Sequence, residues 1–126
     1  MAEKKKLLLV EDETITAMSL RASLERLGYE VSETVVTGYE AVQKAFSYKP
    51  SVILMDINLI GEMNGVEAVE KIHEKNPIPV IYITGYSNRE IKERALRTRP
   101  LAYLEKPVNV SDIQALLESG AGITAT

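Results

Sequence analysis

The sequence contains no cysteine and no tryptophan, and it has only one phenylalanine among its 126 residues. The absence of cysteine excludes disulfide bonds, thiolate zinc sites and a cysteine nucleophile, and it is typical of proteins in a reducing cytoplasm. Long apolar runs are also lacking. The run Leu7–Val10 ends at Glu11, whereas a secretory signal needs about 7 to 15 apolar residues and a membrane helix about 18. We therefore expect a cytoplasmic protein without a membrane segment.

An excess of basic residues is missing as well. Fifteen Lys and Arg stand against 18 Asp and Glu, which gives a formal net charge of −3. Nothing in this balance favours binding to nucleic acid or to anionic lipid, so we expect no direct contact with either. The length suits one globular domain that buries its core without disulfides. We expect this domain at 1–119, followed by a flexible tail or linker stub at 120–126.

What the sequence does contain is a regular alternation of two patterns. Short aliphatic runs predict strands at 6–10, 52–55, 79–83 and 101–104, and an alternating pattern predicts another at 30–36. Apolar residues at helical spacing follow each run, in segments that open near residues 14, 41, 66, 91 and 110. Five strands alternating with five helices predict a parallel α/β sheet covered on both faces. In such sheets, ligands bind beyond the carboxyl ends of the strands.

Polar residues stand where the predicted strands end. Glu11 and Asp12 follow the first strand, Asp56 the third, Thr84 the fourth and Lys106 the fifth. If the first and third strands are neighbours, three carboxylates meet, and each pair about 5 Å apart repels by roughly 3 kcal/mol at an effective dielectric near 20. Such a cluster favours a bound cation. Oxygen ligands without nearby His or Cys indicate Mg²⁺, or Mn²⁺, before zinc.

The charges of these residues also suit a phosphoryl group. Three carboxylates and Lys106 sum to −2, which one divalent ion would neutralise. With the ion, the Lys106 ammonium and the Thr84 hydroxyl around it, a carboxylate could attack phosphorus and hold the product as an acyl phosphate. Asp56 is the best candidate nucleophile, because its strand is predicted to lie between the acidic pair and Lys106.

Five motifs, taken in order, resemble those of two-component response-regulator receiver domains. The triplet Glu11-Asp12-Glu13 resembles their acidic pocket. Met55–Leu59 and Met63–Glu67 resemble their phosphoacceptor segment. Ile83–Gly85 resembles the end of their fourth strand, and Tyr103–Pro107 the end of their fifth. The resemblance covers about residues 5 to 118. Among receiver domains, the chain resembles the single-domain chemotaxis regulators. This resemblance implies a flavodoxin-like three-layer sandwich, with five helices and a five-stranded parallel sheet in the order 2-1-3-4-5.

The same resemblance implies roles for the acidic residues. Asp56 would accept a phosphoryl group from a partner histidine kinase. Asp12 would bind Mg²⁺ directly and Glu11 through a water molecule, while Asn58 would offer its backbone carbonyl to the ion. Asp56 would complete the ligand set, so the metal site would comprise two residues from the first strand end and two from the third.

Further roles concern the switch and the output. Thr84 would bind a phosphoryl oxygen and Lys106 would pair with the phosphoryl group. Thr84 would then move towards the phosphate and Tyr103 would turn inward behind it. The altered surface would comprise the fourth helix, fifth strand and fifth helix, and would bind a downstream protein. The chain would act as a monomer or as a phosphorylation-linked dimer, and Pro107 permits a cis bond after Lys106.

Three other functions compete with this interpretation. A pseudo-receiver would use the same fold for protein contacts without phosphotransfer. A phosphoaspartyl hydrolase of the haloacid dehalogenase type would need a second acid two residues after its nucleophile, where Asn58 stands. A flavin carrier would need a phosphate-binding loop, where the acidic residues 11–13 would repel phosphate.

We expect a signalling protein rather than an enzyme, one that catalyses only its own phosphorylation and dephosphorylation. A receiver of this length has no room for an output domain. Its signal would therefore leave through protein contacts, unless the chain is a receiver cut from a larger protein.

Overall fold

The structure is a computed structural model that describes residues 5–85 and 87–119, so the predicted tail at 120–126 lies outside the described residues. Within this part of the chain, five strands alternate with five helices. They are β1 (Lys6–Val10), α1 (Thr14–Arg26), β2 (Glu30–Val31), α2 (Gly38–Tyr48), β3 (Val52–Met55), α3 (Gly65–His73), β4 (Val80–Thr84), α4 (Arg89–Arg97), β5 (Ala102–Glu105) and α5 (Val110–Glu118).

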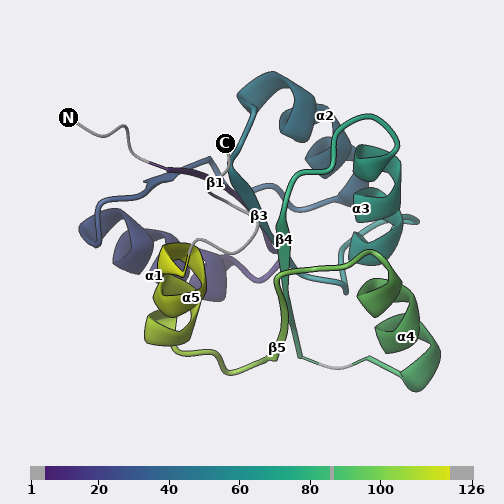
Figure 1. Cartoon of the computed structure of the whole chain (residues 1–126). Helices are drawn as coiled ribbons and strands as arrows, with labels where there is room; N and C mark the ends of the chain where they lie inside the picture. The colour runs from purple at the N-terminus through teal and green to yellow at the C-terminus, as the bar shows by residue number, and fades with distance from the viewer. Residues whose placement is uncertain (1–4, 86, 120–126) are drawn as a thin grey trace.

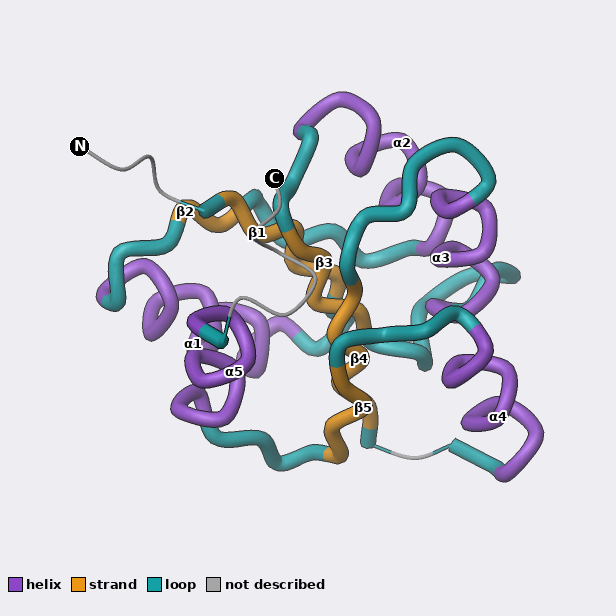
Figure 2. The backbone as a smooth tube through the Cα atoms, in the orientation of Figure 1, coloured by secondary structure: helices purple, strands orange, loops and turns teal. Residues whose placement is uncertain are grey.

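The five strands form one parallel sheet in the order β2-β1-β3-β4-β5. Helices α1 and α5 cover one face, and α2, α3 and α4 cover the other (Figure 1). Figure 2 shows the strands crossing the molecule from β2 to β5 between these two helical layers. The predicted flavodoxin-like sandwich and its strand order are confirmed. The fourth and fifth strands begin and end one residue later than predicted.

The core lies on both faces of the sheet because alternate residues of a strand point in opposite directions. The cluster shared with α2, α3 and α4 receives Leu8, Val10, Ile53 and Met55. The cluster shared with α1 and α5 receives Leu7, Leu9, Val52 and Leu54. Each fully buried aliphatic side chain stabilises the fold by about 1.5 to 3 kcal/mol. These strands therefore anchor whatever follows their carboxyl ends.

The second strand is shorter than predicted, since β2 ends at Val31 rather than at residue 36. The Leu9 N–H donates to the Ser32 hydroxyl at 3.1 Å, so a side chain accepts the bond that a strand carbonyl would take. The chain rejoins β1 at Val35, whose N–H donates to the Leu9 carbonyl at 3.0 Å. Ser32 thus interrupts the ladder within a segment whose alternating pattern predicts one continuous strand.

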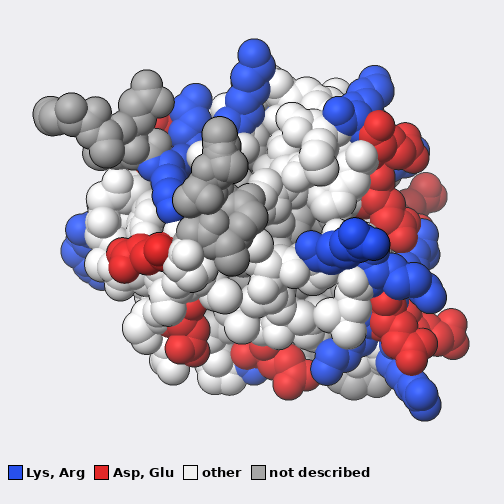
Figure 3. All heavy atoms as spheres, in the orientation of Figure 1, with Lys and Arg blue, Asp and Glu red and all other residues white. Residues whose placement is uncertain are grey.

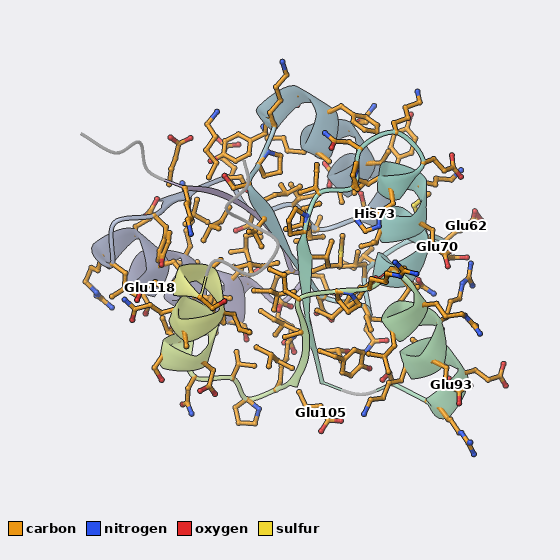
Figure 4. The ribbon with its side chains drawn as sticks, viewed as in Figure 1. Glu62, Glu70, His73, Glu93, Glu105 and Glu118 are labelled. Atoms are coloured by element: carbon orange, nitrogen blue, oxygen red, sulfur yellow. The ribbon has the colours of Figure 1, made fainter. Side chains whose placement is uncertain are left out.

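Charged side chains gather over α3 and α4 at one edge of the molecule (Figure 3). There the Arg94 guanidinium makes two hydrogen bonds to Glu70, at 2.8 and 2.6 Å, and so ties α4 to α3. Figure 4 labels Glu70 on α3. No helix among the described residues has the length and apolar character needed to cross a membrane.

Candidate functional site

The first and third strands bring two carboxylates together at one edge of the sheet. Val10 pairs with Met55 in register, so the residues that follow, Glu11 and Asp56, lie side by side. The Asp56 N–H donates to the Val10 carbonyl at 3.0 Å. Both side chains are buried, with exposed fractions of 2% for Glu11 and 3% for Asp56. Packing of the strands therefore holds this pair in place.

Asp12 completes an acidic cluster at this edge. Glu11, Asp12 and Asp56 each offer a carboxylate oxygen, and these three oxygens lie within 4.8 Å of one another. A hollow of about 240 Å³ opens beside them, and its lining includes Asp12, Asp56 and Asn58. Convergent oxygen atoms without nitrogen or sulfur ligands suit a hard cation such as Mg²⁺. The residues present fit such an ion.

Lys106 reaches into the cluster from the end of β5. Its backbone N–H donates to the Thr84 carbonyl at 2.9 Å, and the Lys106–Pro107 peptide bond is cis. The ammonium Nζ lies 2.9 Å from a Glu11 oxygen and 3.0 Å from Asp56 Oδ2. A third contact, at 2.7 Å, goes to Glu13. One positive charge is therefore shared among three carboxylates.

The pKa values reflect this shortage of positive charge. Burial raises the pKa of Glu11 from 4.5 to about 7; the hydrogen bond from Lys106 lowers it in part and Asp56 raises it. Burial also lowers the pKa of Lys106, but its hydrogen bonds to Glu13, Glu11 and Asp56 outweigh burial and raise that pKa overall. The pKa of Glu13 is lowered, chiefly by its hydrogen bond with Lys106. Lys106 stays charged, and the buried acids favour one more cation.

Both oxygens of Asp56 are engaged. The Asn58 N–H donates to Oδ1 at 3.1 Å, while Lys106 holds Oδ2. The Asn58 amide in turn donates to the Thr84 hydroxyl at 3.4 Å. Thr84 is buried at the end of β4, on the side of β3 opposite to β1. The carboxylate thus lies between an acidic side and a side that bears hydroxyl and ammonium groups.

The first residue of helix α3 packs closely against the backbone of Asp56. Its first residue is Gly65, and a Cβ added there would lie 2.2 Å from the Asp56 carbonyl oxygen. The Gly65 N–H donates to the Ile57 carbonyl at 2.9 Å. Asn64 and Glu67 form a capping box that fixes the start of the helix. Only glycine allows this approach, which sets the position of the Asp56 backbone.

Tyr103 lies apart from the acidic cluster, on β5. Its ring is half-buried against the core, with its centroid 6.1 Å from that of Tyr82. Its hydroxyl is hydrogen-bonded to Ser87, and the Lys92 ammonium lies 5.3 Å from the ring centroid. Tyr103 therefore connects β5 with α4 and the segment before it.

The structure brings six of the seven predicted site residues to one edge of the sheet: Glu11, Asp12, Asp56, Asn58, Thr84 and Lys106. The seventh, Tyr103, lies beyond Thr84. Sequence reasoning assigned no role to Glu13 or Ser87. The sequence did mark Glu13 as unusual, since it belongs to the acidic triplet and occupies a helix N-cap, where glutamate is not among the preferred residues. No sequence feature marked Ser87.

Comparison with known proteins confirms the predicted resemblance. The sequence model of a family described as "Response regulator receiver domain" matches residues 7–118. The transcriptional regulatory protein PdtaR of Mycobacterium tuberculosis is 33% identical over 117 residues, which are 93% of this chain and 57% of that protein. The chain thus spans little more than half the length of this curated relative.

Two solved structures are similar over nearly the whole chain. The signal receiver domain of a modulated diguanylate cyclase from Desulfovibrio desulfuricans G20 has a TM-score of 0.86 and 36% identity, and the match covers 93% of each chain. The receiver domain of the sensor histidine kinase PA1611 from Pseudomonas aeruginosa PAO1 has a TM-score of 0.83 and 28% identity, with 98% of this chain and 100% of that chain covered. The latter structure has a magnesium ion coordinated in its active-site cleft.

Proposed function

This chain belongs to the response regulator receiver domain family, and on that premise we propose that it is a signalling switch set by phosphorylation of Asp56. Receiver domains are signalling domains that interact with histidine kinases and downstream effectors. The observation that carries the proposal is the position of Asp56, buried at a strand end between an acidic cluster and the Lys106 ammonium. A buried carboxylate in such surroundings is more typical of a functional group than of a structural one.

The acidic cluster would hold Mg²⁺, or Mn²⁺ in its place. Asp12 and Asp56 would contribute carboxylate oxygens, Glu11 would act through a water molecule, and Asn58 would offer its backbone carbonyl. When bound, the ion would supply positive charge next to the incoming phosphoryl oxygens. The magnesium ion coordinated in the receiver domain of PA1611 supports this assignment by similarity.

Phosphoryl transfer would begin with a carboxylate oxygen of Asp56 attacking the phosphorus of a phosphohistidine on a partner kinase. The new O–P bond forms as the P–N bond breaks, and the imidazole nitrogen leaves with the electron pair and takes up a proton. Lys106 would turn from the carboxylate to a phosphoryl oxygen, and the Thr84 hydroxyl would donate to another. Both groups already lie around the nucleophile, so little rearrangement is needed.

The output would arise on the β4–β5 side. Movement of the Thr84 hydroxyl towards the phosphoryl group would favour an inward position of Tyr103, whose hydroxyl is hydrogen-bonded to Ser87 before α4. The surface of α4, β5 and α5 would then bind a downstream protein. The unit would be a monomer or a phosphorylation-linked dimer.

The first test is the mass of the protein after incubation with phosphoramidate and Mg²⁺. We expect one added phosphoryl group on the wild-type chain and none on Asp56→Asn. Asp12→Asn should reduce the yield by weakening Mg²⁺ binding. Asp112→Asn is the matched control, since it removes an exposed carboxylate from the first turn of α5 and should not alter the yield.

Three outcomes would contradict the proposal. A wild-type chain that is folded but gains no phosphoryl group would indicate a pseudo-receiver, which uses its surface without phosphotransfer. A phosphoryl group that is retained in Asp56→Asn would place the acceptor elsewhere. Continuous release of phosphate from many substrate molecules would indicate a phosphoaspartyl hydrolase.

A further inference from the structure

Glu13 occupies the N-cap of α1 but does not cap it. Its backbone is extended, with φ −89° and ψ 108°, as an N-cap requires, yet its side chain makes no cap hydrogen bond. Ser, Thr, Asp and Asn are the residues that cap helices well. The Glu13 carboxylate instead lies 2.7 Å from the Lys106 ammonium, the shortest of the three ion pairs of that lysine. The side chain also has a hydrogen bond with Thr16 in the first turn of α1, but its interaction with Lys106 is the larger one.

The three partners of Lys106 fall into two groups. Glu11 and Asp56 belong to the acidic cluster, whereas Glu13 stands outside it, with 61% of its side chain exposed. A divalent cation bound among the clustered oxygens would repel the ammonium and compete with it for those carboxylates. Glu13 is then the carboxylate, among the partners described, to which Lys106 can move without leaving the edge of the site.

We propose that Glu13 is a positioning residue that takes over the Lys106 ammonium when a divalent cation binds, and so keeps it beside Asp56 for the incoming phosphoryl group. This inference rests on the proposed function, because it requires the cation site. An exposed glutamate opposite a long lysine side chain can follow the ammonium as it moves. Glu13 would thus aid cation binding without contacting the ion.

The proposal predicts that the effect of Glu13 passes through Lys106, which a double-mutant cycle measures. The readout is the Mg²⁺ dissociation constant, from shifts of backbone amide resonances in a titration with MgCl₂. Glu13→Gln should weaken Mg²⁺ binding about threefold, as expected for loss of a partly exposed ion pair. Lys106→Met should tighten binding, because a competing cation is removed. Adding Glu13→Gln to Lys106→Met should change nothing further.

Glu105→Gln is the matched control. It removes one carboxylate next to Lys106 in the sequence, but Glu105 is exposed at the last position of β5 and its side chain points away from the rest of the protein (Figure 4). Its Mg²⁺ affinity should equal that of the wild type. Thermal unfolding verifies that each variant is folded, and Lys106→Gln replaces Lys106→Met if the latter does not fold.

Two results would overturn the proposal. If Glu13→Gln weakens binding equally with and without Lys106, the carboxylate acts by its own charge or as a ligand. If it weakens binding in neither background, Glu13 has no part in cation binding. Failure of the wild-type chain itself to bind Mg²⁺ would instead contradict the proposed function, and so the two failures are distinguishable.

Discussion

The sheet edge that carries the candidate site has two halves, one at the ends of β1 and β3 and one at the ends of β4 and β5, and they are built differently. On the β1–β3 half, the carboxylates of Glu11 and Asp56 follow strands whose residues are almost all buried. On the β4–β5 half, β4 is fully buried as well, but β5 contains only half-buried and exposed residues, with Tyr103 among the half-buried ones. The strands that would bind the ion are therefore fixed by packing, whereas β5, which would carry the signal, is less deeply set in the core.

Polar contacts supplement packing on the second half, around β5 and α4. The Tyr103 hydroxyl bonds to Ser87, the Tyr82 hydroxyl lies 2.8 Å from the Thr98 hydroxyl, and the Arg94–Glu70 pair joins α4 to α3. Each of the two hydroxyl hydrogen bonds contributes roughly 0.5 to 1.5 kcal/mol, much less than a strand of buried aliphatic residues. Rearrangement of β5 and of the segment before α4 thus costs less than rearrangement of β1 or β3, which a switch requires.

The largest difference in stability between the two halves should come from Gly65→Ala, which disturbs the backbone that follows β3. The added methyl group would lie 2.2 Å from the Asp56 carbonyl oxygen and 2.9 Å from the Ile57 Cα, both of which are backbone atoms. Backbone must move to relieve this contact, so we expect a loss of about 3 kcal/mol in the free energy of unfolding. Urea denaturation measures it.

Gly85→Ala is the control from the other half. A Cβ there would meet only the Lys106 Cδ, at 3.9 Å, which is an ordinary van der Waals contact. We expect a change below about 0.5 kcal/mol. Equal losses at Gly65 and Gly85 would contradict the difference in rigidity between the halves.

The two halves also differed in how far sequence could predict them. The aliphatic runs placed β1 and β3 at their observed bounds, and the residues at their ends gave the acidic cluster, because a buried run followed by carboxylates has few structural explanations. The order of the strands came from resemblance to a family, since pairing between distant segments leaves no local signal.

Other features depend on tertiary contacts that no local sequence pattern predicts. The Ser32 hydroxyl interrupts β2 by accepting a hydrogen bond from the Leu9 N–H, which a serine in an alternating segment does not reveal. The Glu13 pair spans 93 positions to Lys106, and Ser87 meets Tyr103 only because α4 folds back beside β5. Side-chain partners of this kind follow from the fold and cannot be read before it.

A second, smaller effect should appear in the pH dependence of stability without metal. The pKa of Glu11 is raised in the folded protein from 4.5 to about 7, so the folded state holds a proton that the unfolded state has released. Stability should therefore fall as pH rises from 4.5 to about 7, by on the order of 1 to 2 kcal/mol after allowance for screening. Urea denaturation across this range measures the slope.

Glu11→Gln isolates the contribution of the Glu11 carboxyl to the pH dependence of stability. Glu13 has a lowered pKa, so its contribution has the opposite sign and is lost below pH 4.5. A variant without the Glu11 carboxyl should show a flatter profile between pH 4.5 and 7. An unchanged slope would mean that another group titrates there.

The smallest effect should come from Tyr103→Phe, which alters the less packed half alone. The ring and its contact with Tyr82 remain, while the hydrogen bond to Ser87 is lost, so we expect about 1 kcal/mol of destabilisation. Tyr39→Phe, at an exposed position on α2, is the control and should cost less. Hydrogen exchange should quicken in α4 but not in β1 or β3.

The affinity of Tyr103→Phe for Mg²⁺ decides whether the halves are independent in the resting protein. Tyr103 contacts neither the acidic cluster nor Lys106 among the contacts described, so the dissociation constant should not change. A changed affinity would show that the cation site already senses α4 before any phosphoryl group arrives. An unchanged one, together with faster exchange in α4, would place the coupling between the halves at Thr84 and Lys106, the two groups that a phosphoryl group on Asp56 would recruit.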